Sequence, residues 1–133
     1  FDLQKDGKSE EFIKLKVEKT KNNFLNSPFL ILLCMDTSDL EIYPNSKRRK
    51  NEFLLGIQSI SSSATYLLLS LEMKNLAACW YCAPLFAEDI IKEHLKLPEN
   101  YSPMAFFTVG YPIESVKAPK RKKLREIIHK LNI

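Results

Sequence analysis

One stretch, residues 53–84, constrains the fold most, because it places a long apolar helix directly before an apolar strand. Apolar residues recur at steps of three and four from Phe53 to Leu71, which is the period of a helix with a buried face. Further apolar positions lie around the rest of this helix, so we expect other elements to enclose it. The charge-free run from Asn75 to Pro84 then predicts a buried strand that ends at the proline. Such a core can also support a flat ligand.

Helical and apolar stretches alternate along the rest of the chain. Amphipathic spacing predicts helices over residues 9–24, 87–97 and 124–131, the first of them capped by Ser9. Unbroken apolar runs predict strands over residues 29–35 and 104–109. Residues 36–51 and 116–123 are expected to be polar loops. This order predicts one layered domain of the α/β or α+β class.

Length and composition agree with a single domain. The 133 residues are 45% hydrophobic, which is enough for one core. The longest apolar run, residues 28–35, is strand-sized, so we expect no membrane span, and the charged residues 1–26 do not resemble a signal peptide. Three cysteines are too few for a disulfide framework and favour a reducing cytoplasm. The chain begins with Phe1 rather than Met, so we expect further residues upstream.

The net charge of +4 suits a phosphate-bearing ligand as well as nucleic acid. Cations concentrate near the C-terminus, at Lys117, Lys120, Arg121, Lys122, Lys123 and Arg125. Most of them are expected to form a solvated face. A Pro-rich turn that brings Lys120 and Arg121 to a helix start can bind one phosphate. We find no basic groove interleaved with aromatic residues, which argues against nucleic acid as a partner.

The cysteines and histidines do not predict a catalytic or metal site. Cys79 and Cys82 are three positions apart in the expected strand, so they should point to opposite faces of the sheet and do no redox chemistry. We expect both to be buried thiols that act as small hydrophobic groups. Cys34 is the nearest third thiol, and without a paired histidine zinc is disfavoured. His94 and His129 are expected to be exposed and inert.

Four short motifs resemble the flavin-dependent nitroreductase family in their order and spacing. They are N-L-A-A-C-W at residues 75–80, L-K-L-P at 95–98, V-G-Y-P at 109–112 and K-R-K at 120–122. In that family a G-L-G-x-x-W strand, an L-G-L-P helix end, a G-Y-P strand end and a basic phosphate-binding segment follow one another. The resemblance covers nearly the whole chain.

One branch of the family, the C-terminal domain of the ligase that adds glutamate to the deazaflavin coenzyme, is the most similar. It shares D-L-x-x-D-G, seen here at residues 2–7, and Y-P-x-x-x-R-R, seen at residues 43–49. The resemblance implies that Asp2 contacts the substrate. It also implies a nitroreductase-like α+β sandwich with a mixed sheet packed by helices around one long helix, without the N-terminal part of the family fold.

The resemblance further implies an FMN site at the interface of a homodimer. Trp80, Tyr81 and Cys82 would lie beside the flavin ring, largely through backbone groups, and Lys120 or Arg121 would hold the phosphate. Family enzymes pass a hydride from a nicotinamide or deazaflavin donor through FMN to an acceptor, so no catalytic side chain is expected to stand out. A non-catalytic relative with the same fold and a nucleotide- or nucleic-acid-binding module remain alternatives.

The chain departs from the family pattern at three places. It has no R-R-S-x-R run, which makes the first FMN contact in the family. Asn75 and Ala77 replace the two glycines of the family strand. Asparagine tolerates a positive φ, whereas the Ala77 side chain narrows the space beside the backbone. The Q-N pair of the family's long helix is Thr65-Tyr66 here.

Overall fold

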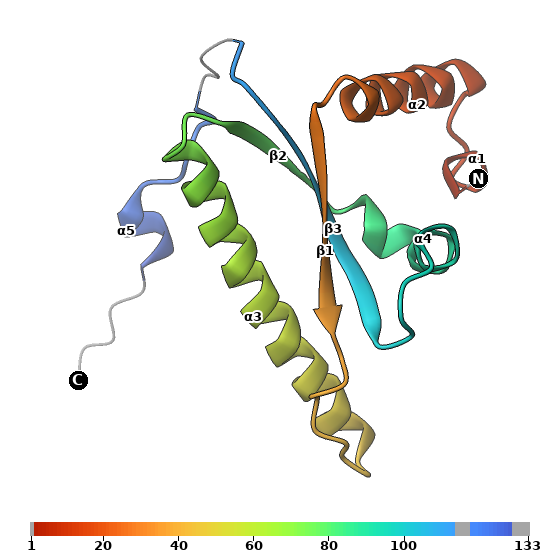
Figure 1. Cartoon of the computed structure of the whole chain (residues 1–133), viewed down its shortest axis with the longest axis vertical. Helices are drawn as coiled ribbons and strands as arrows, with labels where there is room; N and C mark the ends of the chain where they lie inside the picture. Colours follow the sequence, from red (N-terminus) through yellow and green to blue (C-terminus); the bar gives the residue numbers. More distant parts are fainter. Residues whose placement is uncertain (1, 114–117, 129–133) are drawn as a thin grey trace.

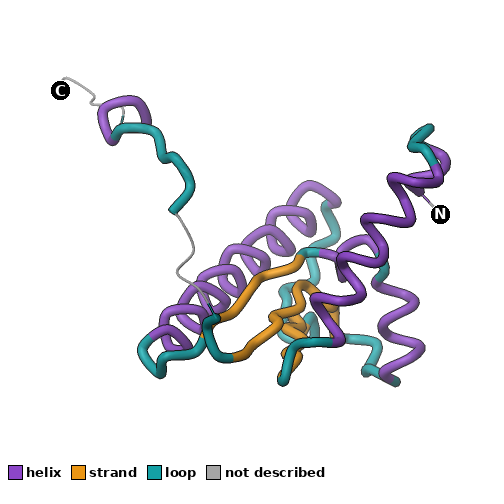
Figure 2. Tube along the Cα trace, turned by 90° about the horizontal axis from the view of Figure 1, so that it is seen from above, coloured by secondary structure: helices purple, strands orange, loops and turns teal. Residues whose placement is uncertain are grey.

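The computed structural model describes residues 2–113 and 118–128, and the helices of the first range lie in layers around one sheet (Figure 1). The long helix α3 (Ser46–Glu72) covers one face of the sheet. The helices α2 (Glu10–Leu25) and α4 (Glu88–Leu95) lie on the other side, as the view from above also shows (Figure 2). The predicted α+β fold around a long central helix is therefore confirmed.

The sheet consists of β1 (Phe29–Asp36), β2 (Ala77–Tyr81) and β3 (Tyr101–Gly110) in the order β1-β3-β2. Both pairings are antiparallel. The expectation of a mixed sheet is therefore wrong for the described residues. The reason is topological: α3 returns the chain so that β1 and β2 run in the same direction, and β3 inserts between them in the opposite direction.

Helix α3 begins at Ser46, so the loop that we expected over residues 36–51 is shorter than predicted. The side chain of Asn45 caps the helix by accepting a hydrogen bond from the Arg48 backbone N–H at 3.1 Å. The guanidinium of Arg49 donates to the carbonyl oxygens of Tyr43 and Pro44, each at 2.7 Å. These contacts fold the loop back onto the helix start and explain why a basic run can belong to the first turns.

The core lies between α3 and the sheet. Its buried members are Ala64 of α3 and Ala105, Phe107 and Val109 of β3. The odd-numbered side chains of β3 face α3, because side chains alternate along a strand. Ala64 is fully buried, and its small side chain lets α3 pack against the strand at this point.

The opposite side of α3 remains exposed, so the expected enclosure of this helix is wrong for the described chain. Leu55, Tyr66, Leu69 and Met73 are all more than half exposed, at 59%, 69%, 56% and 86%. A three-stranded sheet covers only one side of a helix. By length and composition α3 also suits a membrane span, but the central helix of a soluble fold meets the same criterion, so this is weak evidence.

The other helices of the described residues are each four residues long. They are α1 (Asp2–Lys5), the 3₁₀ helix η1 (Ala83–Phe86) and α5 (Leu124–Ile127). Ser9 caps α2 as predicted, since its Oγ accepts from the Phe12 backbone N–H at 3.3 Å. Two predicted features extend outside the described residues. They are the end of the expected last helix, residues 129–131 with His129, and Lys117 of the basic cluster.

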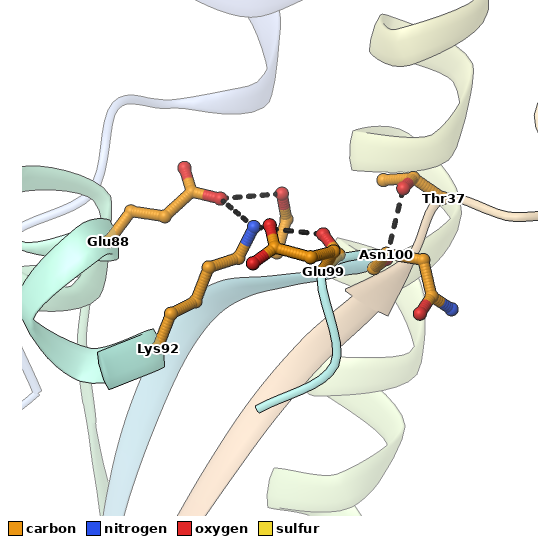
Figure 3. A network of polar contacts seen from close by, with 6 residues as sticks. Thr37, Glu88, Lys92, Glu99 and Asn100 are labelled. Atoms are coloured by element: carbon orange, nitrogen blue, oxygen red, sulfur yellow. Dashed lines mark hydrogen bonds and ion pairs between the residues drawn. The ribbon is translucent and has the colours of Figure 1, made fainter. Parts of the chain in front are cut away.

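A polar network holds α4 against the start of β3 (Figure 3). The Lys92 ammonium lies 3.2 Å from the Glu88 carboxylate and donates to the carbonyl oxygen of Glu99 at 3.0 Å. The Ser102 hydroxyl donates to the same Glu88 carboxylate at 3.0 Å. Because η1 directly precedes α4, this network also positions the residues that follow β2.

Candidate functional site

Strand β2 forms an edge of the sheet and presents the residues that the sequence singled out. It pairs with β3 along one side, and no other strand in the described ranges pairs along its second side. An edge strand leaves every second residue with an N–H and a C=O free to bind a ligand. Asn75 has a left-handed backbone, with φ of 57°, and turns the chain from α3 into this strand. This confirms the prediction that Asn75 tolerates a positive φ.

Trp80 and Tyr81 lie on opposite faces of β2. The Trp80 ring packs toward α3, where its centroid is 5.4 Å from that of Phe107. The Tyr81 ring packs toward α2, with its centroid 4.9 Å from that of Phe24. One flat ligand therefore cannot contact both rings, and it can meet both residues only through their backbone.

A cleft of about 440 Å³ lies between the C-terminal end of α2 and the β2–β3 pair, and we call it the polar cleft for the amide, hydroxyl and phenol groups within its otherwise apolar lining. Amide, hydroxyl and phenol groups line it, among them those of Asn23, Asn26, Ser27, Tyr81, Thr108 and Tyr111. Burial, followed by the neighbouring Cys79 thiol, raises the pKa of Tyr81 above its ordinary value, so the phenol stays protonated at neutral pH. Sequence reasoning missed this cleft, because the asparagines at its rim were interpreted only as helix-ending residues.

A smaller cavity of about 90 Å³ lies on the α3 side of β2. Trp80, Cys82 and Ser61 line it together with apolar side chains of α3, β1 and β3. The indole Nε1 of Trp80 is buried, and no acceptor within the described ranges reaches it. An indole N–H can only donate, and at this buried position a small acceptor such as a water molecule in the cavity would satisfy it.

The two cysteines of C-x-x-C face different sides, as predicted. Cys79 lines the polar cleft, whereas Cys82 lines the small cavity. The prediction that they are buried is wrong, since both are exposed. Cys79 lies on an edge strand, and Cys82 follows its end, at the start of η1. Within the described ranges, no cluster of His, Cys, Asp and Glu could hold a metal ion.

The other predicted site residues are not brought to β2. Lys120 and Arg121 lie in the segment of residues 118–128, all of which are exposed, and this segment projects away from the sheet (Figure 2). Asp2 begins α1, and its side chain is outside the described part of the molecule. His94 is exposed, as predicted, and its Nδ1 lies 2.9 Å from the Ile90 carbonyl oxygen.

The comparisons with known proteins agree with this architecture. Residues 2–111 match the Nitroreductase family. A BluB-like flavoprotein from Clostridium difficile 630 is 22% identical with a TM-score of 0.70, over 98% of this chain and 67% of that one. The NfrA1 nitroreductase from B. subtilis is 17% identical with a TM-score of 0.62, over 87% of this chain and 53% of that one.

A third structure, an FMN-dependent nitroreductase from Clostridium difficile R20291, is 20% identical with a TM-score of 0.52. The match covers 90% of this chain and 88% of that one. At these identities the structures show a shared fold. The chain spans about half to two thirds of the length of several of its structural neighbours, at 67%, 65% and 51%.

Proposed function

Because the chain belongs to the nitroreductase family, we propose that it is an FMN-dependent oxidoreductase that passes a hydride through bound flavin. The donor would be a nicotinamide or a deazaflavin, the latter in metabolism of the deazaflavin coenzyme. The observation that carries the proposal is the open edge of β2, where backbone donors and acceptors from Ala77 to Tyr81 are available to a flat ligand.

The groups at β2 fit the chemistry of a flavin ring. The ring system carries carbonyl acceptors, ring nitrogens and an imide N–H, which suit the alternating N–H and C=O groups of a strand edge. The exposed Lys120 and Arg121 have the charge that a phosphate needs.

These groups do not meet within one chain, so the proposal includes a homodimer. The uncovered side of α3, which includes Leu55, Tyr66 and Leu69, offers an apolar surface for a second copy. In such a dimer, the basic segment of one copy can reach the flavin held at β2 of the other. The polar and apolar parts of the site would then come from both chains.

Bound FMN would supply the hydride transfer itself. The residues of this chain would bind and orient the ring and exclude water from one side of it. The β2 backbone would hydrogen-bond to the ring edge, and the Phe107–Trp80 pair would keep that backbone fixed against α3. The phenol of Tyr81, protonated at neutral pH, can donate a hydrogen bond to a ligand in the polar cleft.

A titration of the purified protein with FMN tests the proposal. Trp80 is the only tryptophan, so flavin binding can be followed by quenching of its fluorescence and by the visible spectrum of the retained flavin. Changing Lys120 and Arg121 together to Ala should weaken FMN binding by about a hundredfold or more, because each charge-assisted contact contributes about 1.5–3 kcal/mol. The matched control is the double change of Lys122 and Lys123 to Ala.

Equal weakening in the control pair would indicate diffuse charge and would favour the nucleotide- or nucleic-acid-binding alternative. Failure to retain flavin in a protein that sediments as a stable dimer would favour the non-catalytic relative. Two residues motivate that second alternative: Ala77 adds a side chain at a family glycine, and Tyr66, in place of a family amide, is 69% exposed. A stable monomer at micromolar concentration would contradict the homodimer.

A further inference from the structure

An apolar groove of about 640 Å³ lies on the side of the sheet opposite α3, between α1, α2 and α4. Its apolar surface comes from Leu3, Val17, Phe24, Ala83, Ile91 and Phe106. The groove is separate from the small cavity at Trp80, which lies on the α3 side. Its volume is within the range of about 300–1,000 Å³ that small-molecule sites have.

Two aromatic rings form the floor of this groove. The ring of Phe24 meets the ring of Phe106 edge-on, with centroids 5.6 Å apart and an interplanar angle of 87°. Val17 also lines the groove and is 54% exposed. Covering this surface with an alkyl chain would remove apolar area from water, which is favourable.

Lysines are the only charged side chains that line the groove among the described residues. Lys16 and Lys21 both belong to α2, and no carboxylate lines the groove beside them. At roughly 100° per residue, they fall on either side of the stripe formed by Val17, Thr20 and Phe24. Within the described ranges neither lysine forms an ion pair, and the Lys16 ammonium lies 5.8 Å from the Phe12 ring centroid.

This charge selects between possible occupants. The exposed segment of residues 118–128 is itself basic, so the same segment of a second copy would be repelled by Lys16 and Lys21. An anionic group, by contrast, is attracted by both lysines. Along the axis of α2, Lys16 and Phe24 are about 12 Å apart at 1.5 Å per residue. A site of this length suits an extended alkyl chain better than a compact ring.

We propose that the groove binds an anionic amphiphile, namely a carboxylate that carries a single alkyl chain. The chain lies over Phe24 and Phe106, and the carboxylate lies near Lys16 and Lys21. This site is independent of flavin, because it lies on the opposite face from the small cavity and does not include the open edge of β2.

The test uses the whole 133-residue protein and the fluorescent fatty acid dansyl-undecanoic acid, below its micelle concentration. We expect saturable binding of one probe per chain, displacement by oleate and weakening by added salt. The double change Lys16→Ala and Lys21→Ala should weaken binding about fivefold to tenfold, as expected for two exposed charges. The control is Lys14→Ala with Lys19→Ala, two exposed lysines of α2 that do not line the groove and whose loss should change affinity less than twofold.

A second variant tests the position of the alkyl chain. Val17→Glu places a carboxylate at the exposed mouth of the groove and should abolish binding while the circular dichroism spectrum stays unchanged. Equal weakening by both lysine pairs, or equally tight binding of the methyl ester of the probe, would overturn the proposal. So would displacement by FMN, or displacement by an acidic amphipathic peptide but not by oleate.

Discussion

The side-chain amide of Asn23 donates a hydrogen bond to the Tyr81 hydroxyl at 3.2 Å, and this contact joins the end of α2 to the edge strand β2. The neighbouring Phe24 ring packs on the Tyr81 ring, so a polar and an apolar contact hold the two elements together. The pair also forms part of the wall of the polar cleft.

The variant Tyr81→Phe should lower the free energy of unfolding by about 0.5–1.5 kcal/mol, because it removes one hydrogen bond and keeps the ring. Tyr81→Ala should cost more, since the contact with Phe24 is also lost. Urea unfolding at neutral pH measures both. Indistinguishable losses from the two variants would show that the hydroxyl, rather than the ring, joins α2 to β2.

Asp36 should make the stability of the protein sensitive to acid. Its carboxylate accepts hydrogen bonds from the Ser38 hydroxyl and backbone N–H and from the Asn100 amide, at 2.7, 2.9 and 2.6 Å. These bonds, those of Ser38 first, hold the pKa of Asp36 below its ordinary value of 3.8. The unfolded chain therefore takes up the proton at a higher pH than the folded chain.

Asp36 therefore contributes to the free energy of unfolding above about pH 4. This contribution is lost as the pH falls through the lowered pKa that Asp36 has in the folded protein. Asp36→Asn should be less stable than the wild type at pH 7, and the difference should shrink below pH 4. Thermal unfolding across this pH range measures the effect, with Asp39→Asn as the control. A difference that is constant with pH would contradict this role.

Gly56 lets α3 approach the end of β1. A Cβ at this position would lie 2.7 Å from the Sδ of Met35 and 3.4 Å from a methyl group of Leu40, and Met35 is only 4% exposed. Alanine favours a helix over glycine by about 1 kcal/mol, but overpacking costs about 1–3 kcal/mol. We therefore expect Gly56→Ala to destabilise the protein by up to about 2 kcal/mol in urea unfolding.

Ser62→Ala is the matched control for that variant, because Ser62 is an exposed residue of the same helix. It should be neutral or stabilising by a few tenths of a kcal/mol. If Gly56→Ala stabilises the protein as much as the control does, the Met35 side chain moves aside without a loss of stability, which would contradict the prediction.

The three thiols should differ in their reactivity toward a thiol-specific reagent at pH 8. Cys79 and Cys82 are exposed and should react fast, whereas Cys34 is half-buried and burial raises its pKa, opposed only partly by Lys92. We expect two fast thiols and one slow thiol, and the slow phase should disappear in Cys34→Ser. A disulfide between Cys79 and Cys82 of the same chain after mild oxidation would contradict their placement on opposite sides of β2.

Local sequence patterns specify the secondary structure of this protein. The helix cap at Ser9, the left-handed backbone at Asn75 and the apolar period of α3 depend on residues that are close in the sequence. These features could therefore be predicted. The order of short motifs also predicted the fold that the family match confirms. The start of α3 was missed because the cap at Asn45 is followed by cations, which usually indicate a loop.

Which surfaces are covered depends on contacts between segments that are far apart in the sequence. The insertion of β3 between β1 and β2 makes the sheet antiparallel and leaves Cys79 on an exposed edge, and no local pattern in either strand specifies its partner. The Asn23–Tyr81 contact and the groove at Lys16 and Lys21 likewise join segments far apart in the sequence. Local backbone preferences act over a few residues, whereas pairing and burial depend on which distant surfaces meet, and that was decided only when the chain folded.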